Sequence, residues 1–203
     1  MAEENMDTAA KILKAAEDEF MEKGYGNARM MSIAARAGVS HSMLHYYYRS
    51  KEDLFQKVFE SKAGIIIHIL EGIHGQGMSF EETVKSFIEN KFDVIRANSW
   101  FCSFMLNDVL RNKENLRRII QMMVPRLTGH YEWFSKMLNE EIAAGRVRRI
   151  TVRDLVLNIV FTNVAAFITM PIINELMPDT DIDDYLDERK KSNVDFILAA
   201  LRP

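Results

Sequence analysis

The sequence predicts an all-α protein, and three observations support this fold class. Apolar residues recur with the 3.6-residue period of a helix along nearly the whole chain of 203 residues. No segment sustains the polar–apolar alternation of a half-buried strand. The composition agrees, because the chain has 13 Met and 12 Phe but only 4 Pro and 9 Gly, and Met favours helices while Pro and Gly interrupt them. We expect about nine helices, in an N-terminal helix-turn-helix domain and a larger helical body.

The N-terminal domain, residues 1–50, is expected to hold three helices. The first covers about residues 7–23, the second about 29–37 and the third about 40–48. Gly38 can adopt the left-handed conformation that ends a helix, and Ser40 is a good N-cap. Two short helices joined by a tight turn form a helix-turn-helix, which places its second helix in the major groove of DNA.

Residues 51–203 are predicted to form the second domain, a body of longer helices for effector binding and dimerisation. Ser50, Ser79 and Thr151 each stand three residues before an acidic side chain, in the pattern of a helix capping box. The expected helices cover about residues 51–73, 79–97, 100–111, 114–145, 151–170 and the stretch from an acidic loop at 179–184 to residue 201.

Composition and charge limit the possible functions. The net charge of -3 excludes a generally basic coat protein for nucleic acids, so DNA binding requires a local basic surface. The single cysteine, Cys102, excludes an intrachain disulfide and a Cys-based zinc cluster, and we expect a buried thiol in a cytoplasmic protein. His68, His74 and His130 lack the spacing of metal ligands, so no metal or other cofactor is predicted.

Two further classes of protein find no support in the sequence. The acidic N-terminus does not resemble a signal peptide, and no apolar run reaches the ~20 residues of a membrane helix, so no membrane partner is expected. No Ser/His/Asp order, glycine-rich phosphate loop or ligand cluster indicates an enzyme.

The third helix has a surface suited to DNA. No acidic residue occurs between Lys23 and Lys51. Leu44 and Tyr48 share one face and should hold the helix against its neighbours. Arg29 and Lys51 stand at the start of helices, where free backbone N–H groups favour a phosphate. The outer face of the third helix carries side chains that can bond base edges and phosphates, namely His41, Ser42, His45 and Tyr46.

Three segments of this domain resemble the DNA-binding domain of TetR-family transcriptional regulators. In the order and spacing of that family they are residues 8–25 (TAAKILKAAEDEFMEKGY), 32–40 (SIAARAGVS) and 44–55 (LHYYYRSKEDLF). The resemblance covers about residues 8–59. It implies three helices for DNA and six or more for ligand binding and dimerisation. It also implies that Lys51 contacts a phosphate. Contacts with the bases or the backbone of DNA are implied for Ser40, His41, Ser42 and Tyr46.

The chain departs from the family pattern at three places. His45 stands where a tyrosine usually bonds a phosphate, and an imidazole can donate one such bond. Tyr48 stands where phenylalanine is usual, so its hydroxyl needs solvent or a partner. The Thr often found early in the second helix is absent near Arg29 and Met30, so Arg29 is expected to supply the phosphate contact there.

Met and aromatic side chains are concentrated in the middle helices of the second domain. One interpretation is a pocket for a flat or oily effector, which the family resemblance favours. The other interpretation is ordinary core packing. The candidate pocket residues are Phe101, Phe104, Met105, Met123, Trp133, Phe134, Met137, Phe161, Asn163 and Phe167.

The last two long helices are expected to form a dimer interface, as two helices from each subunit can make a four-helix bundle. A twofold dimer would set two recognition helices ~34–36 Å apart. The alternative is that these apolar faces cover only the core of their own subunit. The faces are Leu155, Ile159, Val160, Asn163, Phe167 and Met170 in one helix, and Tyr185, Leu186, Val194, Ile197, Leu198 and Leu201 in the other.

The sequence therefore predicts a cytoplasmic, homodimeric and ligand-responsive DNA-binding regulator. We expect a repressor that binds a near-palindromic operator and is released by an apolar or aromatic small molecule. The alternative is a helical protein-interaction module that has lost DNA binding, for which the departure at His45 is the support.

Overall fold

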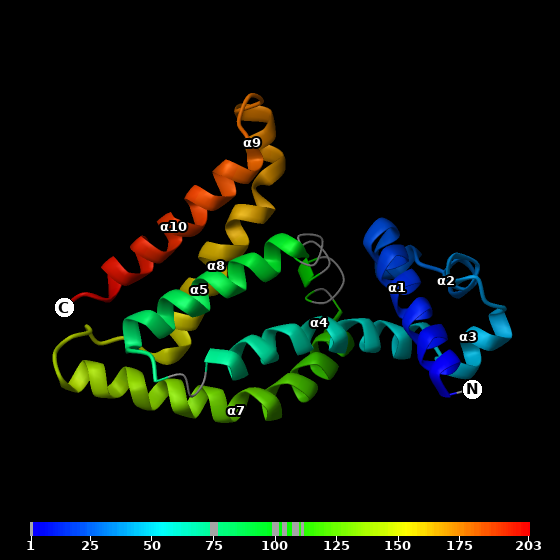
Figure 1. Ribbon diagram of the computed structural model, residues 1–203, viewed down its shortest axis with the longest axis horizontal. Helices are drawn as coiled ribbons and strands as arrows, with labels where there is room; N and C mark the ends of the chain where they lie inside the picture. Colours follow the sequence, from blue (N-terminus) through cyan, green and yellow to red (C-terminus); the bar gives the residue numbers. More distant parts are fainter. Residues whose placement is uncertain (1, 74–76, 99–101, 103–104, 107–109, 111) are drawn as a thin grey trace. The chain divides into compact units, whose positions relative to one another are not determined.

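The computed structural model describes residues 2–73, 77–98, 102, 105–106, 110 and 112–203 (Figure 1). These residues contain nine α-helices and no β-strand, which confirms the all-α class. The chain divides into two compact units. Unit 1 comprises residues 1–64 and 103–122, and unit 2 comprises residues 65–102 and 123–203. The helix predicted over residues 100–111 lies largely outside the described residues.

Unit 1 contains α1 (Ala2–Asn27), α2 (Met30–Ala37), α3 (His41–Tyr47) and the first part of α4 (Lys51–Ile73). The helix bounds lie close to the predicted ones, except that α1 begins earlier and continues past Gly24. The φ of 71° and ψ of 163° at Gly24 put a kink at the predicted end. The apolar faces of these helices form one core, which includes Ile12, Ala16, Phe20, Ile33, Leu44, Leu54 and Phe55.

A buried carboxylate holds α2 against α1. Glu19 is fully buried and accepts hydrogen bonds from Lys23 Nζ at 2.8 Å and Ser32 Oγ at 2.9 Å. The Arg36 guanidinium lies 3.6 Å from Glu19 and 2.6 Å from Glu22. Burial raises the pKa of Glu19, but the hydrogen bonds from Lys23 and Ser32 outweigh it, so the net shift is downward. The carboxylate therefore stays ionised and links the two helices.

Unit 1 extends beyond residue 50, the domain boundary expected from the sequence. Phe55 of α4 packs against α1, with its ring centroid 5.6 Å from that of Phe20 and 4.6 Å from that of Tyr25. Lys62 pairs with Glu17 at 2.8 Å. The start of α4 thus completes the core of the helix-turn-helix domain, while the division of labour between residues 1–50 and 51–203 stays a prediction.

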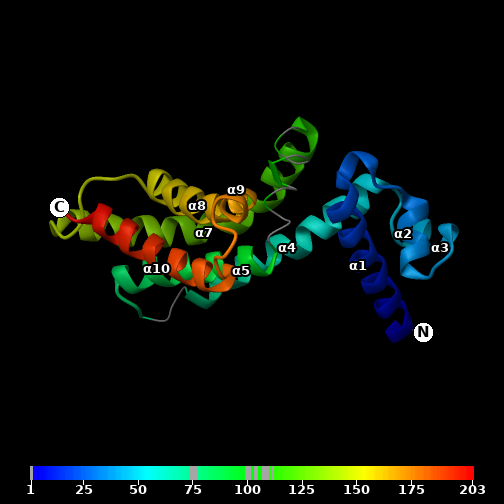
Figure 2. The ribbon, with the colours of Figure 1, turned by 90° about the horizontal axis from the view of Figure 1, so that it is seen from above.

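Unit 2 contains the end of α4, α5 (Phe80–Ala97), the C-terminal part of α7 (Lys113–Ala143), α8 (Val152–Ile168), α9 (Met170–Leu176) and α10 (Ile182–Leu201). Helices α5, α8 and α10 contact one another pairwise (Figure 2). Their shared core includes Val84, Ile88, Leu155, Ile159, Val194, Ile197 and Leu201.

Two buried asparagines connect these three helices. Asn163 Nδ2 donates to the carbonyl of Ile88 at 2.9 Å. Asn193 Nδ2 donates to Asn163 Oδ1 at 3.0 Å and to the carbonyl of Thr162 at 3.2 Å. Asn163 therefore belongs to the core, because its amide satisfies polar groups of α5 and α10.

The dimer faces predicted for α8 and α10 point into unit 2 instead. Leu155, Ile159 and Phe167 of α8 are buried. The corresponding residues of α10 are buried in the same way, namely Leu186, Val194, Ile197 and Leu201. These side chains therefore cover the core of their own subunit, as in the alternative interpretation.

Among the described residues, no single helix has the length and apolar character that a membrane span needs. Helices α8 and α9 meet the criteria only as a pair, with a bend of 48° between them.

Candidate DNA interface and effector pocket

Local sequence signals form the turn between α2 and α3. Gly38 ends α2 with a φ of 69°, and its N–H donates to the carbonyl of Ala35 at 3.2 Å. Ser40 begins α3 by accepting a hydrogen bond from Met43 N at 3.1 Å. Both features match the predicted left-handed stop and N-cap. The turn thus leads directly into a short helix at the surface of unit 1.

The outer face of α3 presents hydroxyl and imidazole groups to solvent. Tyr46 is 80% exposed, and the rings of His41 and His45 lie 4.4 Å apart between centroids. Leu44 is fully buried and Tyr48 is 7% exposed, as predicted for the inner face. Ser40, at the start of α3, is exposed too. The predicted DNA-facing side chains of the helix itself are all exposed, namely His41, Ser42, His45 and Tyr46.

The geometry of His45 limits how it can bond a phosphate. Its Nδ1 lies 3.2 Å from the carbonyl oxygen of Arg49. A carbonyl can only accept, so Nδ1–H donates this bond. A neutral imidazole has one N–H, so Nε2 would donate to a phosphate only when His45 is protonated.

Lys51 is engaged inside unit 1. Its Nζ donates to the carbonyls of Tyr25, Gly26 and Ala28 at 2.8, 3.3 and 3.1 Å. It also lies 4.6 Å from the centroid of the Tyr25 ring. An ammonium has three N–H donors, and all three have acceptors here. A direct phosphate contact by Lys51, as predicted from the sequence, would require one of these bonds to break.

Two exposed arginines stand at ends of the helices of the helix-turn-helix. Arg29 is the exposed N-cap residue of α2 and makes no side-chain capping bond. Arg49 is exposed just after α3. Sequence reasoning missed Arg49, although its place one turn after His45 is a visible signal. Among the described residues neither guanidinium lies within 4.0 Å of a carboxylate, whereas Arg36 is paired with Glu22.

Unit 2 contains a partly open cavity of about 210 Å³ whose walls come from α5, α7 and α8. Ile73, the last residue of α4, also lines it. Most of the lining is apolar, including Phe87, Leu127, Trp133, Phe134, Val152 and Val156. The polar side chains of the lining are Thr83, Lys91, His130 and Tyr131.

Trp133 and Phe134 are the predicted pocket residues that line this cavity. Phe101 and Phe104 lie outside the described residues. Met105 belongs to unit 1, Met123 is half-buried but absent from the lining, and Met137 packs against the core.

Three further candidate pocket residues do not line this cavity. Phe161 is 66% exposed because it lies on the outer side of α8. Asn163 bonds within the core, and Phe167 packs there with its ring 4.9 Å from that of Phe92. Helical periodicity indicates which residues face inward, but it does not distinguish a packed side chain from a cavity wall.

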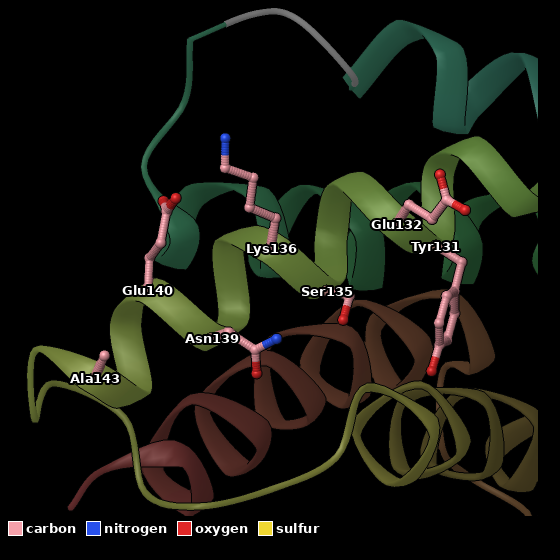
Figure 3. Close-up of a pocket in the computed structure, with 7 residues that line it drawn as sticks. All are labelled: Tyr131, Glu132, Ser135, Lys136, Asn139, Glu140 and Ala143. Carbon is pink, nitrogen blue, oxygen red and sulfur yellow. The ribbon is translucent and has the colours of Figure 1, made fainter.

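The outer surface of α7 carries a separate shallow depression (Figure 3). Figure 3 shows Glu132, Lys136 and Glu140 pointing to one side of the helix and Tyr131 and Asn139 to another. All of its lining residues come from this one helix, so it lacks the enclosing walls of a ligand pocket.

Possible metal ligands are dispersed in the described part of the chain, where no three His, Cys, Asp or Glu side chains form a group that could hold an ion. His68 lies 3.7 Å from Glu71 at an exposed position, and His74 lies outside the described residues. Cys102 is buried, as predicted, and burial raises the pKa of its thiol.

Comparisons with known proteins agree with this geometry. The family model described as bacterial regulatory proteins, tetR family, matches residues 12–58, which include α2, the turn and α3. The chain is 22% identical over 165 residues to the fatty acid metabolism regulator protein of Bacillus subtilis (strain 168), covering 81% of this chain and 84% of that protein. It is 34% identical over 99 residues to the HTH-type transcriptional regulator RutR of Escherichia coli (strain K12), covering 47% of this chain and 46% of that protein.

The likeness to solved structures extends over both units. The transcriptional regulator FadR from Bacillus subtilis, solved in complex with stearoyl-CoA, superposes with a TM-score of 0.73 at 20% identity, covering 95% of this chain and 99% of that one. These matches do not favour a protein-interaction module that has lost DNA binding. Residues 12–58, with their tight turn and exposed third helix, thus match the DNA-binding region of the tetR family of bacterial regulatory proteins, and the chain as a whole shares the fold of FadR.

Proposed function

We propose that this regulator is a repressor that binds a near-palindromic operator as a homodimer and is released by an effector in the cavity of unit 2. The observation that carries the DNA part is the exposed outer face of α3. That face offers hydrogen-bonding side chains, the exposed Arg29 and Arg49 stand before α2 and after α3, and no acidic residue occurs between Lys23 and Lys51. A polyanion can approach such a surface without repulsion.

Fluorescence anisotropy with duplexes selected from a random pool tests the assignment. Replacing His41 or Tyr46 by alanine should change the preferred sequence, because these side chains reach base edges. Lys11→Ala is the matched control, since Lys11 is an exposed lysine of α1 that pairs with Asp7. Unchanged sequence preference in both α3 variants would contradict the proposed reading face.

Exposed apolar side chains on α8 and α10 support dimerisation. Leu157, Phe161 and Ile168 share the outer face of α8 and are 43, 66 and 44% exposed, and Phe196 of α10 is 62% exposed. Helices α8 and α10 are in contact. Apolar groups on two neighbouring helices are the surface that a four-helix bundle between two subunits would bury.

Helix α4 offers a route from effector to DNA. Its last residue, Ile73, lines the cavity, and its first residue, Lys51, bonds the end of α1 beside the helix-turn-helix. An effector that binds one position of α4 more tightly would change the spacing of the two recognition helices in a dimer.

The relatives suggest which effectors to test first. The Bacillus subtilis protein is named a fatty acid metabolism regulator, and the FadR structure holds stearoyl-CoA. We therefore expect an acyl compound to lower operator affinity in the anisotropy assay. An operator complex that is insensitive to acids, alcohols and thioesters of acyl chains would contradict this effector class.

RutR and FadR are named transcriptional regulators. We propose accordingly that the chain has no catalytic activity and that it acts in the cytoplasm, where its operator is located.

A further inference from the structure

The cavity of unit 2 contains a lysine in largely apolar surroundings. Lys91 lines the cavity, and its Nζ lies 5.6 Å from the centroid of the Phe87 ring. Among the described residues no carboxylate lies within 4.0 Å of this Nζ. Burial lowers the pKa of Lys91 to about 8, and the nearby Cys102 offsets this only in part. Lys91 is half-buried, and an ammonium held in largely apolar surroundings without a counter-ion is unfavourable, so the site favours the binding of an anion.

A second polar group in the cavity lacks a partner. Thr83 is 2% exposed, and its Oγ1 makes no hydrogen bond within the described residues. Thr83, Phe87 and Lys91 follow one another at intervals of four residues on α5, so they project from the same face. Their helical spacing puts the Cα atoms of Thr83 and Lys91 about 12 Å apart. The α5 wall is therefore an apolar strip with an unsatisfied polar group near each end.

We infer that the cavity binds an amphipathic carboxylate whose anionic group pairs with Lys91 Nζ and whose apolar body lies along Phe87, Trp133 and Phe134. This inference rests on the proposed effector role of the cavity and adds the chemical class of the effector. The cavity has a volume of about 210 Å³. Pockets that bind drug-sized ligands are larger, at about 300–1,000 Å³. One slender chain or one ring therefore fits, and a nucleotide-sized group does not.

The position of the charge distinguishes the possible acyl ligands. A free acid brings a carboxylate to Lys91. An alcohol brings no charge. A CoA thioester has a neutral carbonyl at the end of its chain. Its negative charges are on the nucleotide, which is too large for the cavity and would remain outside it, away from Lys91. The inference therefore predicts that a free acid is preferred to an alcohol or a thioester with the same chain.

Isothermal titration calorimetry on the full chain tests this preference. The probes are decanoate and 4-phenylbutyrate, as alkyl and aryl carboxylates, together with decanol and decanoyl-CoA. We expect at least one carboxylate to bind about tenfold or more tightly than decanol, the equivalent of about 1.4 kcal/mol. Lys91→Met should abolish this preference by weakening carboxylate binding, without weakening the binding of decanol. Lys85→Met is the matched control, because Lys85 is an exposed lysine of the same helix.

Three results would overturn the inference. The first is that Lys91→Met binds the carboxylates as tightly as the unmodified chain does. The second is that the unmodified chain binds neither carboxylate. The third is that the unmodified chain binds decanol or decanoyl-CoA more tightly than it binds the acids. Thermal unfolding of Lys91→Met, which should be at least as stable as the unmodified chain, excludes misfolding as the reason for lost binding.

Operator binding in the same samples separates this inference from the proposed function. Release of DNA by decanoyl-CoA but not by either carboxylate would overturn the carboxylate assignment and leave effector-controlled repression intact. Absence of any sequence-specific duplex binding would overturn the proposed function, whichever ligand the cavity holds.

Discussion

Replacing Lys91 by methionine should stabilise the protein at neutral pH. In the folded chain burial lowers the pKa of Lys91 to about 8, from 10.5 for an ordinary lysine. At pH 7 the side chain of Lys91 is therefore still an ammonium in the folded state, although its apolar surroundings favour the neutral amine. Methionine has a similar length and shape and carries no charge, so it removes this penalty while filling the same space.

The magnitude follows from the difference between the two pKa values. Each unit corresponds to about 1.36 kcal/mol, so the lowered pKa destabilises the folded state by about 3 kcal/mol at pH 7. Between pH 8 and 10.5 the unfolded chain binds more protons than the folded chain, and stability therefore rises with pH. At pH 9.5 the remaining penalty is about 1 kcal/mol. The stability gap between the variant and the unmodified chain should thus narrow by about 2 kcal/mol over this range.

Urea unfolding at pH 7.0 and 9.5, followed by tryptophan fluorescence, measures this gap, because Trp133 lies in the same cavity. Both proteins are compared in a Cys102→Ser background, because the thiol interacts with Lys91 and titrates in the same range. The remaining groups that titrate there are common to both proteins, so the difference isolates Lys91. Lys85→Met controls for loss of an exposed lysine and should change stability by no more than about 0.5 kcal/mol. A Lys91→Met variant that is no more stable at pH 7, or a gap that is independent of pH, would refute the reasoning.

Two further substitutions test other parts of the structure. Gly38→Ala should destabilise the protein by about 1–2 kcal/mol in urea unfolding, because the φ of 69° at this position is strained for any residue with a Cβ. Gly26→Ala is its control and should not destabilise, since Gly26 is helical and a Cβ there meets nothing within 4 Å. Phe161→Glu should convert a dimer to a monomer in size-exclusion chromatography with light scattering. Met31→Glu is its control and should not change the oligomeric state, although Met31 is an apolar residue that is 72% exposed. A Phe161→Glu variant that stays dimeric would contradict the proposed α8 interface.

The helices were predictable because their ends depend on local chemistry. Ser79 and Glu82 form the reciprocal capping box that their spacing indicates. Gly38 adopts the left-handed conformation that its place after an apolar helix favours. The inner face of α3 could be predicted in the same way, since Leu44 and Tyr48 follow the period of a short helix with one buried side. These features need only a few neighbouring residues, which the sequence supplies directly.

The faces of α8 were not predictable because this helix is apolar nearly all round. Its periodicity admits both the stripe through Ile159 and the stripe through Phe161. Packing against α5 and α10 determines which of the two stripes is buried, and both helices are distant from α8 in the sequence. Asn163, for example, bonds the carbonyl of Ile88, 75 residues earlier. The same limit applies to the cavity, where Lys91 and Thr83 were missed because only the packed helices show them facing an empty space.

Phosphate binding by this domain should depend on arginine rather than on Lys51. The family resemblance implies a phosphate contact for Lys51, but its three N–H groups already bond the carbonyls that end α1, and a saturated donor gains little from a new acceptor. Lys51→Met should therefore lower unfolding stability by about 1–3 kcal/mol and leave the salt dependence of operator binding unchanged.

Arg29 and Arg49 are exposed and lie clear of carboxylates among the described residues. The double change to alanine should therefore reduce the salt slope of binding by about two, one for each phosphate that no longer has a guanidinium beside it. It should leave stability nearly unchanged, because neither side chain is buried. Anisotropy titrations from low to moderate salt measure the slope for both variants. A slope reduced by Lys51→Met and unaltered by the double arginine change would show that the ammonium leaves the end of α1 when DNA binds, and that the resemblance predicted its role correctly.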